Sequence, residues 1–144
     1  MNNLKRILLI DDSETDNFIH RRRFTKLGIC EQVDVCSDGQ QGLQYLTTPG
    51  PDGQHPRPDL LFLDINMPVM DGWEFLDAYR HLPDHQRARV TVAMLTTAVG
   101  DNDLERTYSF GVVDAHEAKP LSDEKLRKLL KQFFPDRVPK KLLD

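Results

Sequence analysis

Three nearly uninterrupted apolar runs, at residues 7–10, 60–63 and 90–95, most strongly constrain how this chain can fold. A strand with one solvated face alternates apolar and polar residues, whereas a strand covered on both faces does not. Two shorter segments, at residues 33–36 and 112–115, are weaker strand candidates. The runs therefore predict strands of a sheet that is buried on both sides, as parallel sheets are.

The segments between these strands carry helix-capping residues. Each begins with a Ser, Asp or Asn that can accept hydrogen bonds from the first free amides of a helix. These residues are Ser13, Ser37, Asp71, Asn102 and Ser122. We expect helices at about residues 13–27, 38–47, 71–82, 102–110 and 122–134. The alternation predicts an α/β domain with a five-stranded parallel sheet and helices on both faces, of the flavodoxin-like, doubly wound class.

The composition fits one such domain and argues against several classes of protein. With 144 residues, 39% of them hydrophobic, the chain can bury one core. A formal net charge of -4 argues against nucleic-acid binding. No segment approaches the roughly 20 apolar residues of a membrane span, and we expect a cytoplasmic protein without membrane contact. The spacing of Cys30 and Cys36 matches no disulfide framework or zinc site.

Polar residues follow the carboxyl ends of the predicted strands, where ligands bind in open α/β sheets. The residues at these positions are Asp11, Asp12, Asp64, Thr96, Thr97 and Lys119. Carboxylates packed together repel one another, so their grouping implies a compensating cation, and oxygen ligands with open positions favour magnesium. A carboxylate beside such an ion can act as a nucleophile toward a phosphoryl group. Lysine and hydroxyl groups can hold the remaining phosphate oxygens.

Four segments, ILLIDDSETD, LLFLDINMPVMDGWEF, MLTTA and AKPLS, together resemble the receiver domain of two-component response regulators. The likeness covers about residues 4–134, and four motifs in register at strand ends make it specific. The resemblance implies a signalling protein rather than an enzyme. Asp64 would accept a phosphoryl group from the phosphohistidine of a histidine kinase or histidine phosphotransfer protein, in a magnesium-dependent reaction.

The resemblance also implies roles for the residues around Asp64. Asp12 would bind magnesium directly and Asp11 would bind it through water, beside Asp64 itself. The backbone carbonyl of Asn66 would complete the metal ligands, and its side chain would influence how long the acyl phosphate survives. Lys119 would contact the phosphate and precede a cis proline peptide bond.

The switch residues of the family match this chain less simply. Counting back from Gly111 places the family's hydroxyl at Thr96, whereas counting back from Lys119 places it at Thr97, because one extra residue lies between them. We favour Thr96, since an extra residue fits more easily in the weak fifth strand. The family's switch aromatic is His116 here. We expect phosphorylation to draw Thr96 inward and to shift the face formed by the fourth helix, fifth strand and fifth helix.

The first predicted helix carries a basic run, His20-Arg21-Arg22-Arg23, followed by Lys26. We interpret it as a solvated outer face. A docking surface for the histidine donor is the alternative, and nucleic acid is not favoured for so short a run.

We expect the receiver domain to span residues 1–134, with a long Pro- and Gly-rich loop at residues 48–58. Residues 135–144 would form a loosely held C-terminal tail, with no output domain. The signal would then pass to an unknown downstream protein.

Two other functions remain open from the sequence. One alternative is a receiver-like adaptor that works without phosphorylation, but the intact set of acids and lysine argues against it. A metal-dependent phosphohydrolase with an aspartyl nucleophile would want a second acid two residues later, where this chain has Asn66.

Overall fold

Five parallel strands form the central sheet in the computed structural model of the protein, which describes residues 3–67, 70–95 and 101–143. The strands are β1 (Leu4–Ile10), β2 (Cys30–Cys36), β3 (Leu60–Asp64), β4 (Val90–Leu95) and β5 (Ala115–Ala118). Their order across the sheet is β2-β1-β3-β4-β5, and every neighbouring pair is parallel. All residues of β3 and β4 are buried, which explains why their sequences do not alternate.

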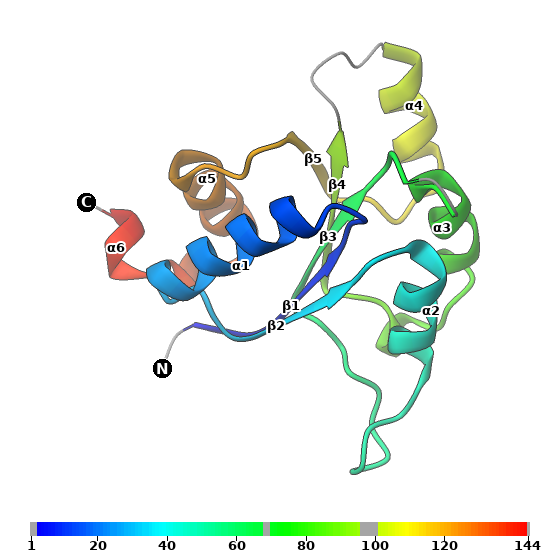
Figure 1. Ribbon diagram of the computed structural model, residues 1–144, viewed down its shortest axis with the longest axis horizontal. Coiled ribbons are helices and arrows are strands. Elements are labelled where there is room, and N and C mark those ends of the chain that lie inside the picture. Colours follow the sequence, from blue (N-terminus) through cyan, green and yellow to red (C-terminus); the bar gives the residue numbers. More distant parts are fainter. Residues whose placement is uncertain (1–2, 68–69, 96–100, 144) are drawn as a thin grey trace.

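Five helices connect and cover the strands, which confirms the predicted α/β architecture (Figure 1). They are α1 (Glu14–Leu27), α2 (Gly39–Thr47), α3 (Gly72–Tyr79), α4 (Asp101–Ser109) and α5 (Asp123–Phe133). One core lies between the sheet and α1 with α5, and a second core lies on the other face against α2 and α3. The predicted caps at Ser13, Asp71 and Ser122 are present, whereas α2 is capped by Asp38 rather than Ser37.

The fifth strand lies three residues beyond its predicted position at residues 112–115. Val112 and Val113 are apolar because they pack against the core on the α2 and α3 side, outside the sheet ladder. The Asp114 carboxylate accepts from the Thr91 backbone N–H at 2.8 Å, and the Asp114 backbone N–H donates to the Thr91 carbonyl at 2.9 Å. The strand that follows is partly exposed at an edge of the sheet, so apolarity does not mark it.

The C-terminal segment is packed against the domain, so the expectation of a loosely held tail is wrong. It contains a 3-10 turn, η2 (Pro135–Arg137), and a short helix, α6 (Lys140–Leu143). Leu142 is only 1% exposed and belongs to the core beneath α1 and α5. Lys141 Nζ donates to the Lys26 carbonyl at 2.8 Å, which ties α6 to the end of α1. The buried Leu142, whose neighbours in the sequence are mostly charged, is the main apolar anchor of this segment.

Replacing Leu142 with alanine should lower the free energy of unfolding by about 2 kcal/mol, because a buried leucine loses its packing and leaves a cavity. Urea unfolding of the two proteins measures the difference. The control is Leu143→Ala, since Leu143 is 57% exposed and its truncation should change the stability by less than about 0.5 kcal/mol. Equal effects of the two substitutions would contradict the packed arrangement.

The long loop between α2 and β3 extends away from the body of the molecule (Figure 1). It turns at Gly53, whose positive φ of 77° suits glycine, and the Gly53 N–H donates to the Gly50 carbonyl at 2.9 Å. Among the described residues, no helix is both long enough and apolar enough to cross a membrane.

Candidate functional site

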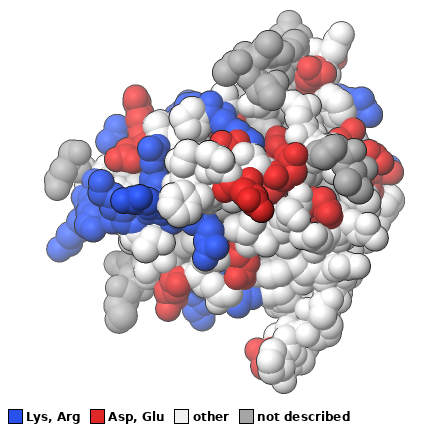
Figure 2. Space-filling view, in the orientation of Figure 1, with Lys and Arg blue, Asp and Glu red and all other residues white. Residues whose placement is uncertain are grey.

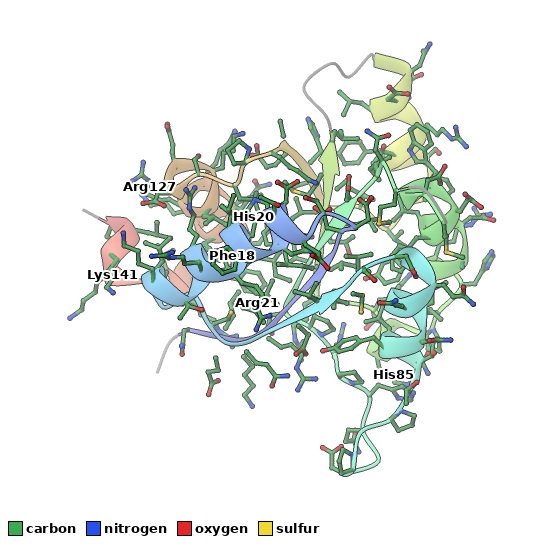
Figure 3. All side chains as sticks on the ribbon, viewed as in Figure 1. Phe18, His20, Arg21, His85, Arg127 and Lys141 are labelled. Carbon is green, nitrogen blue, oxygen red and sulfur yellow. The ribbon has the colours of Figure 1, made fainter. Side chains whose placement is uncertain are left out.

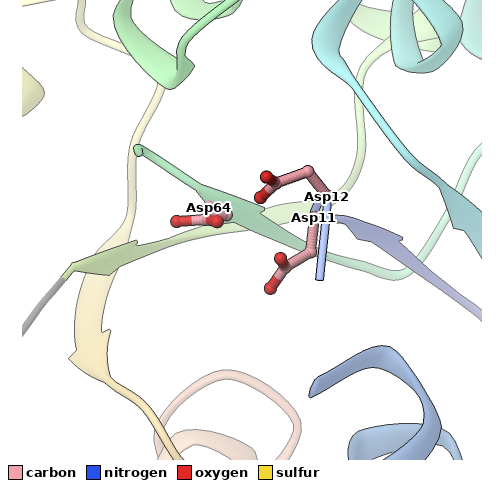
Figure 4. Close-up of side chains that lie close together, drawn as sticks. All are labelled: Asp11, Asp12 and Asp64. Carbon is pink, nitrogen blue, oxygen red and sulfur yellow. The ribbon is translucent and has the colours of Figure 1, made fainter. Parts of the chain in front are cut away.

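Three acids meet at the carboxyl edge of the sheet (Figure 4). Asp11 and Asp12 follow β1, and Asp64 is the last residue of the neighbouring β3. Each offers a carboxylate oxygen within 4.8 Å of the other two. Asp11 and Asp64 are each 5% exposed, whereas Asp12 is open to solvent. The parallel strands therefore bring together the acids that the sequence predicted to meet.

Local hydrogen bonds orient the two buried acids. Asp11 Oδ1 accepts from the Ser13 backbone N–H at 2.9 Å, and the Asp11 carbonyl accepts from the Asn17 side-chain amide at 2.9 Å. Asp64 Oδ1 accepts from the Asn66 backbone N–H at 3.1 Å. The Oδ1 atom of each carboxylate thus accepts a backbone hydrogen bond, whereas the Oδ2 atom of each lies beside the Lys119 ammonium.

Gly72 supports the segment that follows Asp64. Its backbone N–H donates to the Ile65 carbonyl at 2.8 Å. A Cβ atom at position 72 would lie 2.5 Å from the Ile65 Cα atom, so only glycine allows this close approach. Asp71 caps α3 in a capping box with Glu74, which agrees with a structural role for the Asp71-Gly72 pair.

Lys119 supplies a positive charge to the site. Its Nζ lies 2.6 Å from Asp11 Oδ2, 2.9 Å from Asp16 Oδ2 and 3.4 Å from Asp64 Oδ2. Burial lowers the pKa of this lysine, but hydrogen bonds to Asp11 and Asp16 outweigh burial, so its pKa lies above the usual value. Lys119 therefore stays charged at neutral pH. The peptide bond between Lys119 and Pro120 is cis, as the family resemblance implied.

The lysine compensates the acids only in part. Burial, together with the nearby charge of Asp11, raises the pKa of Asp64 to about 6. A second cation would relieve this repulsion, and carboxylate oxygens are donors that magnesium and manganese accept. The donor set of Asp11, Asp12 and Asp64 therefore fits a divalent ion.

Of the residues predicted for the site, Asp11, Asp12, Asp64 and Lys119 come together. Asn66 follows at the strand end with its side chain exposed and its backbone N–H on Asp64. Thr96, the predicted switch hydroxyl, and its alternative Thr97 lie outside the described residues.

The structure separates the basic run of α1 into two sides of the helix (Figure 3). His20 is 3% exposed, and its Nε2 accepts from the Leu121 backbone N–H at 3.2 Å. Burial lowers the pKa of His20, with Asp16 opposing the effect. Arg21 and Arg22 are exposed, as a solvated face requires. Figure 2 shows the Lys and Arg side chains gathered over this part of the molecule, beside an acidic patch.

Two aromatic residues occupy positions near the predicted switch face. The exposed His116 on β5 accepts from or donates to the Tyr108 hydroxyl of α4 through Nδ1 at 2.7 Å. Trp73 Nε1 donates to the Thr107 hydroxyl at 3.2 Å, and the Arg106 guanidinium lies over its ring. His116 thus links β5 to α4, and Trp73 links α3 to α4.

Asp16 is the functional candidate that the sequence did not single out. It stands in the first turn of α1, where its backbone N–H donates to the Ser13 hydroxyl at 3.2 Å. Helix α1 starts beside the acids, so a side chain in its first turn can point back toward them. The position of Asp16 in this turn is the sequence feature from which its role could have been predicted.

The chain is similar to known proteins over most of its length. A family model, the response regulator receiver domain, matches residues 7–131. The probable methanogenesis regulatory protein FilR2 of Methanothrix harundinacea is 32% identical over 88% of this chain and 79% of its own. The probable chemotaxis protein CheY of Rhizobium etli is 32% identical over 90% and 92%. A crystal structure of the Mn(2+)-bound form of response regulator Rcp1, 27% identical, has a TM-score of 0.69 and covers 90% of this chain and 94% of that chain.

Proposed function

The chain belongs to the response regulator receiver domain family, and we propose that Asp64 is its phosphoacceptor in a two-component phosphorelay. The observation that carries the proposal is the grouping of Asp11, Asp12 and Asp64 within 4.8 Å, with the Lys119 ammonium 3.4 Å from Asp64. Such a grouping suits transfer of a phosphoryl group to a carboxylate, which needs positive charge on the phosphate oxygens.

In the proposed reaction, Asp64 Oδ2 attacks the phosphorus of a phosphohistidine. The new P–O bond forms as the P–N bond breaks, and the electron pair remains on the imidazole nitrogen, which then takes a proton. Oδ1 of Asp64 accepts from the Asn66 N–H, whereas Oδ2 lies 3.4 Å from the Lys119 ammonium that would bind the phosphate oxygens, so Oδ2 is the proposed nucleophile. Lys119 then binds an oxygen of the transferred group through its ammonium.

A divalent ion such as magnesium, held by Asp11, Asp12, Asp64 and the carbonyl of Asn66, would supply neutralising charge for the attack. Asp11 and Asp64 orient their carboxylates through the backbone hydrogen bonds described above, so they are prepared to receive the ion. The relative solved with manganese supports this choice of ion by analogy.

The phosphoryl donor in this proposal is a histidine kinase or a histidine phosphotransfer protein, which are partners of receiver domains generally. Residues 1–134 of this chain are the proposed receiver domain, and the C-terminal segment packs on it through Leu142. The output would be contact with a downstream protein through the face of α4, β5 and α5. His116 and Tyr108 lie between α4 and β5, and Thr96 is the proposed hydroxyl that responds to the phosphoryl group.

Incubation with acetyl phosphate and magnesium should label the protein with one phosphoryl group, detected by intact-protein mass spectrometry. Chelation of the metal with EDTA should prevent labelling, because the attacking carboxylate then lacks the neutralising charge of the ion. Restoring excess magnesium should restore labelling. Equal labelling in EDTA would contradict the metal-dependent mechanism.

A further inference from the structure

Helix α1 holds the segment after β5 through a row of three side chains. Asp16, His20 and Arg23 are spaced four and three residues apart, so they share one face of the helix. Asp16 Oδ2 bonds Lys119 Nζ at 2.9 Å, and His20 Nε2 accepts from the Leu121 N–H at 3.2 Å. Arg23 Nη1 donates to the Leu121 carbonyl at 2.6 Å. The helix therefore contacts both the backbone of this segment and the lysine side chain.

The two kinds of contact are separable. His20 and Arg23 bind the backbone of Leu121 by its N–H and its carbonyl, whereas Asp16 binds the Lys119 side chain. Loss of the Asp16 carboxylate would therefore remove one of the three anionic partners of the ammonium without releasing the segment that carries it.

Asp16 also differs from the other two acids on Lys119. Asp11 and Asp64 belong to the acid cluster and have a proposed use as metal ligands. Asp16 stands outside that cluster, and its side chain is 37% exposed. The hydrogen bond from Lys119 lowers the pKa of Asp16, so it remains charged at neutral pH. Asp16 is therefore a charged partner that competes with any anionic group on Asp64 for the Lys119 ammonium.

We propose that Asp16 is a positioning residue that holds the Lys119 ammonium toward α1 and competes with the phosphoryl group for it. This inference rests on the proposed function, in which Lys119 binds a group carried by Asp64. The ammonium lies closer to Asp11 and Asp16, at 2.6 Å and 2.9 Å, than to Asp64, at 3.4 Å. Movement toward a group on Asp64 has to weaken the contact with Asp16. Asp16 therefore reduces the affinity of the site for a phosphoryl group.

Binding of beryllofluoride, a phosphoryl analogue, in saturating magnesium tests the inference and can be followed by ¹⁹F NMR. Asp16→Asn should bind it about fivefold more tightly than the unmodified protein, the size expected for loss of one partly exposed ion pair. Asp16→Glu, which retains the carboxylate, should bind more weakly than Asp16→Asn. The matched control is Glu14→Gln, which removes the same charge from an exposed position in the same turn. Its affinity should stay within about twofold of the unmodified protein, because long-range effects of an exposed charge are screened.

The outcomes separate this inference from the proposed function. Asp16→Asn binding no tighter than Glu14→Gln, while the unmodified protein binds beryllofluoride, would overturn the role of Asp16 alone. Absence of binding by the unmodified protein would refute the proposed function and the inference with it. The ¹⁵Nζ signal of Lys119 in the metal-free protein gives a direct second measurement. It should shift in Asp16→Asn and stay unchanged in Glu14→Gln, and an unshifted signal in Asp16→Asn would also overturn the inference.

Discussion

Replacing Asp64 with asparagine should abolish phosphoryl labelling by acetyl phosphate in the presence of magnesium. The amide oxygen of asparagine is a poor nucleophile and carries no charge, so the proposed P–O bond cannot form. Asparagine has nearly the shape of the aspartic acid and can still accept the Asn66 N–H, so the fold and the neighbouring acids should persist. The loss would therefore report chemistry rather than unfolding, and intact-protein mass spectrometry measures it.

Asp38→Asn is the matched control for that experiment. Asp38 also lies just beyond a strand end, where its side chain caps α2 by accepting from the Gln41 N–H at 2.8 Å. Asparagine caps a helix as well as aspartate does, so this variant should fold and label normally. Labelling of Asp64→Asn at the level of Asp38→Asn would instead show that another acid is the acceptor.

The sequence predicted the sheet and the acid cluster for the same reason. Long buried strands leave an apolar run, and a parallel sheet brings every carboxyl end to one edge. Asp11, Asp12 and Asp64 could therefore be grouped without knowing any side-chain position. Lys119 was predicted with them from its motif, although the strand before it was placed three residues too early.

The contacts of α1 could not be predicted in the same way. A run of four basic residues suggests one charged surface, but a turn of 3.6 residues points successive side chains in different directions. His20 and Arg23 therefore face the segment after β5, whereas Arg21 and Arg22 face solvent. Which of these faces is buried depends on where α5 packs, and this information lies far away in the chain.

The acid cluster also makes a prediction about stability, because the metal-free fold holds Asp64 with a pKa raised to about 6 from an ordinary value of 3.8. Below the ordinary value, Asp64 is protonated in both the folded and the unfolded chain, and it has no effect on stability. As the pH rises between the two values, the unfolded chain releases this proton while the folded protein retains it, which favours unfolding. Above the raised value, the burial of an ionised Asp64 opposes folding at its full cost.

In EDTA, the free energy of unfolding of Asp64→Asn should therefore exceed that of the unmodified protein by about 3 kcal/mol near pH 7, since each unit of pKa corresponds to about 1.36 kcal/mol. Near pH 4 the difference should fall to about 0.5 kcal/mol, because Asp64 is then almost fully protonated in the folded protein and roughly 40% protonated in the unfolded chain. Urea unfolding at the two pH values measures it. A difference that stays constant with pH would contradict the raised pKa of Asp64.

Magnesium should reduce this difference in stability at neutral pH. An ion that binds the folded protein and not the unfolded chain stabilises the fold by mass action, and it binds the ionised form of Asp64. Saturating magnesium should therefore stabilise the unmodified protein more than Asp64→Asn, which lacks one charged ligand. The Asp64 carboxylate destabilises the metal-free fold, and the proposed phosphoryl transfer depends on the same carboxylate. A substitution that removes it therefore increases stability but abolishes labelling.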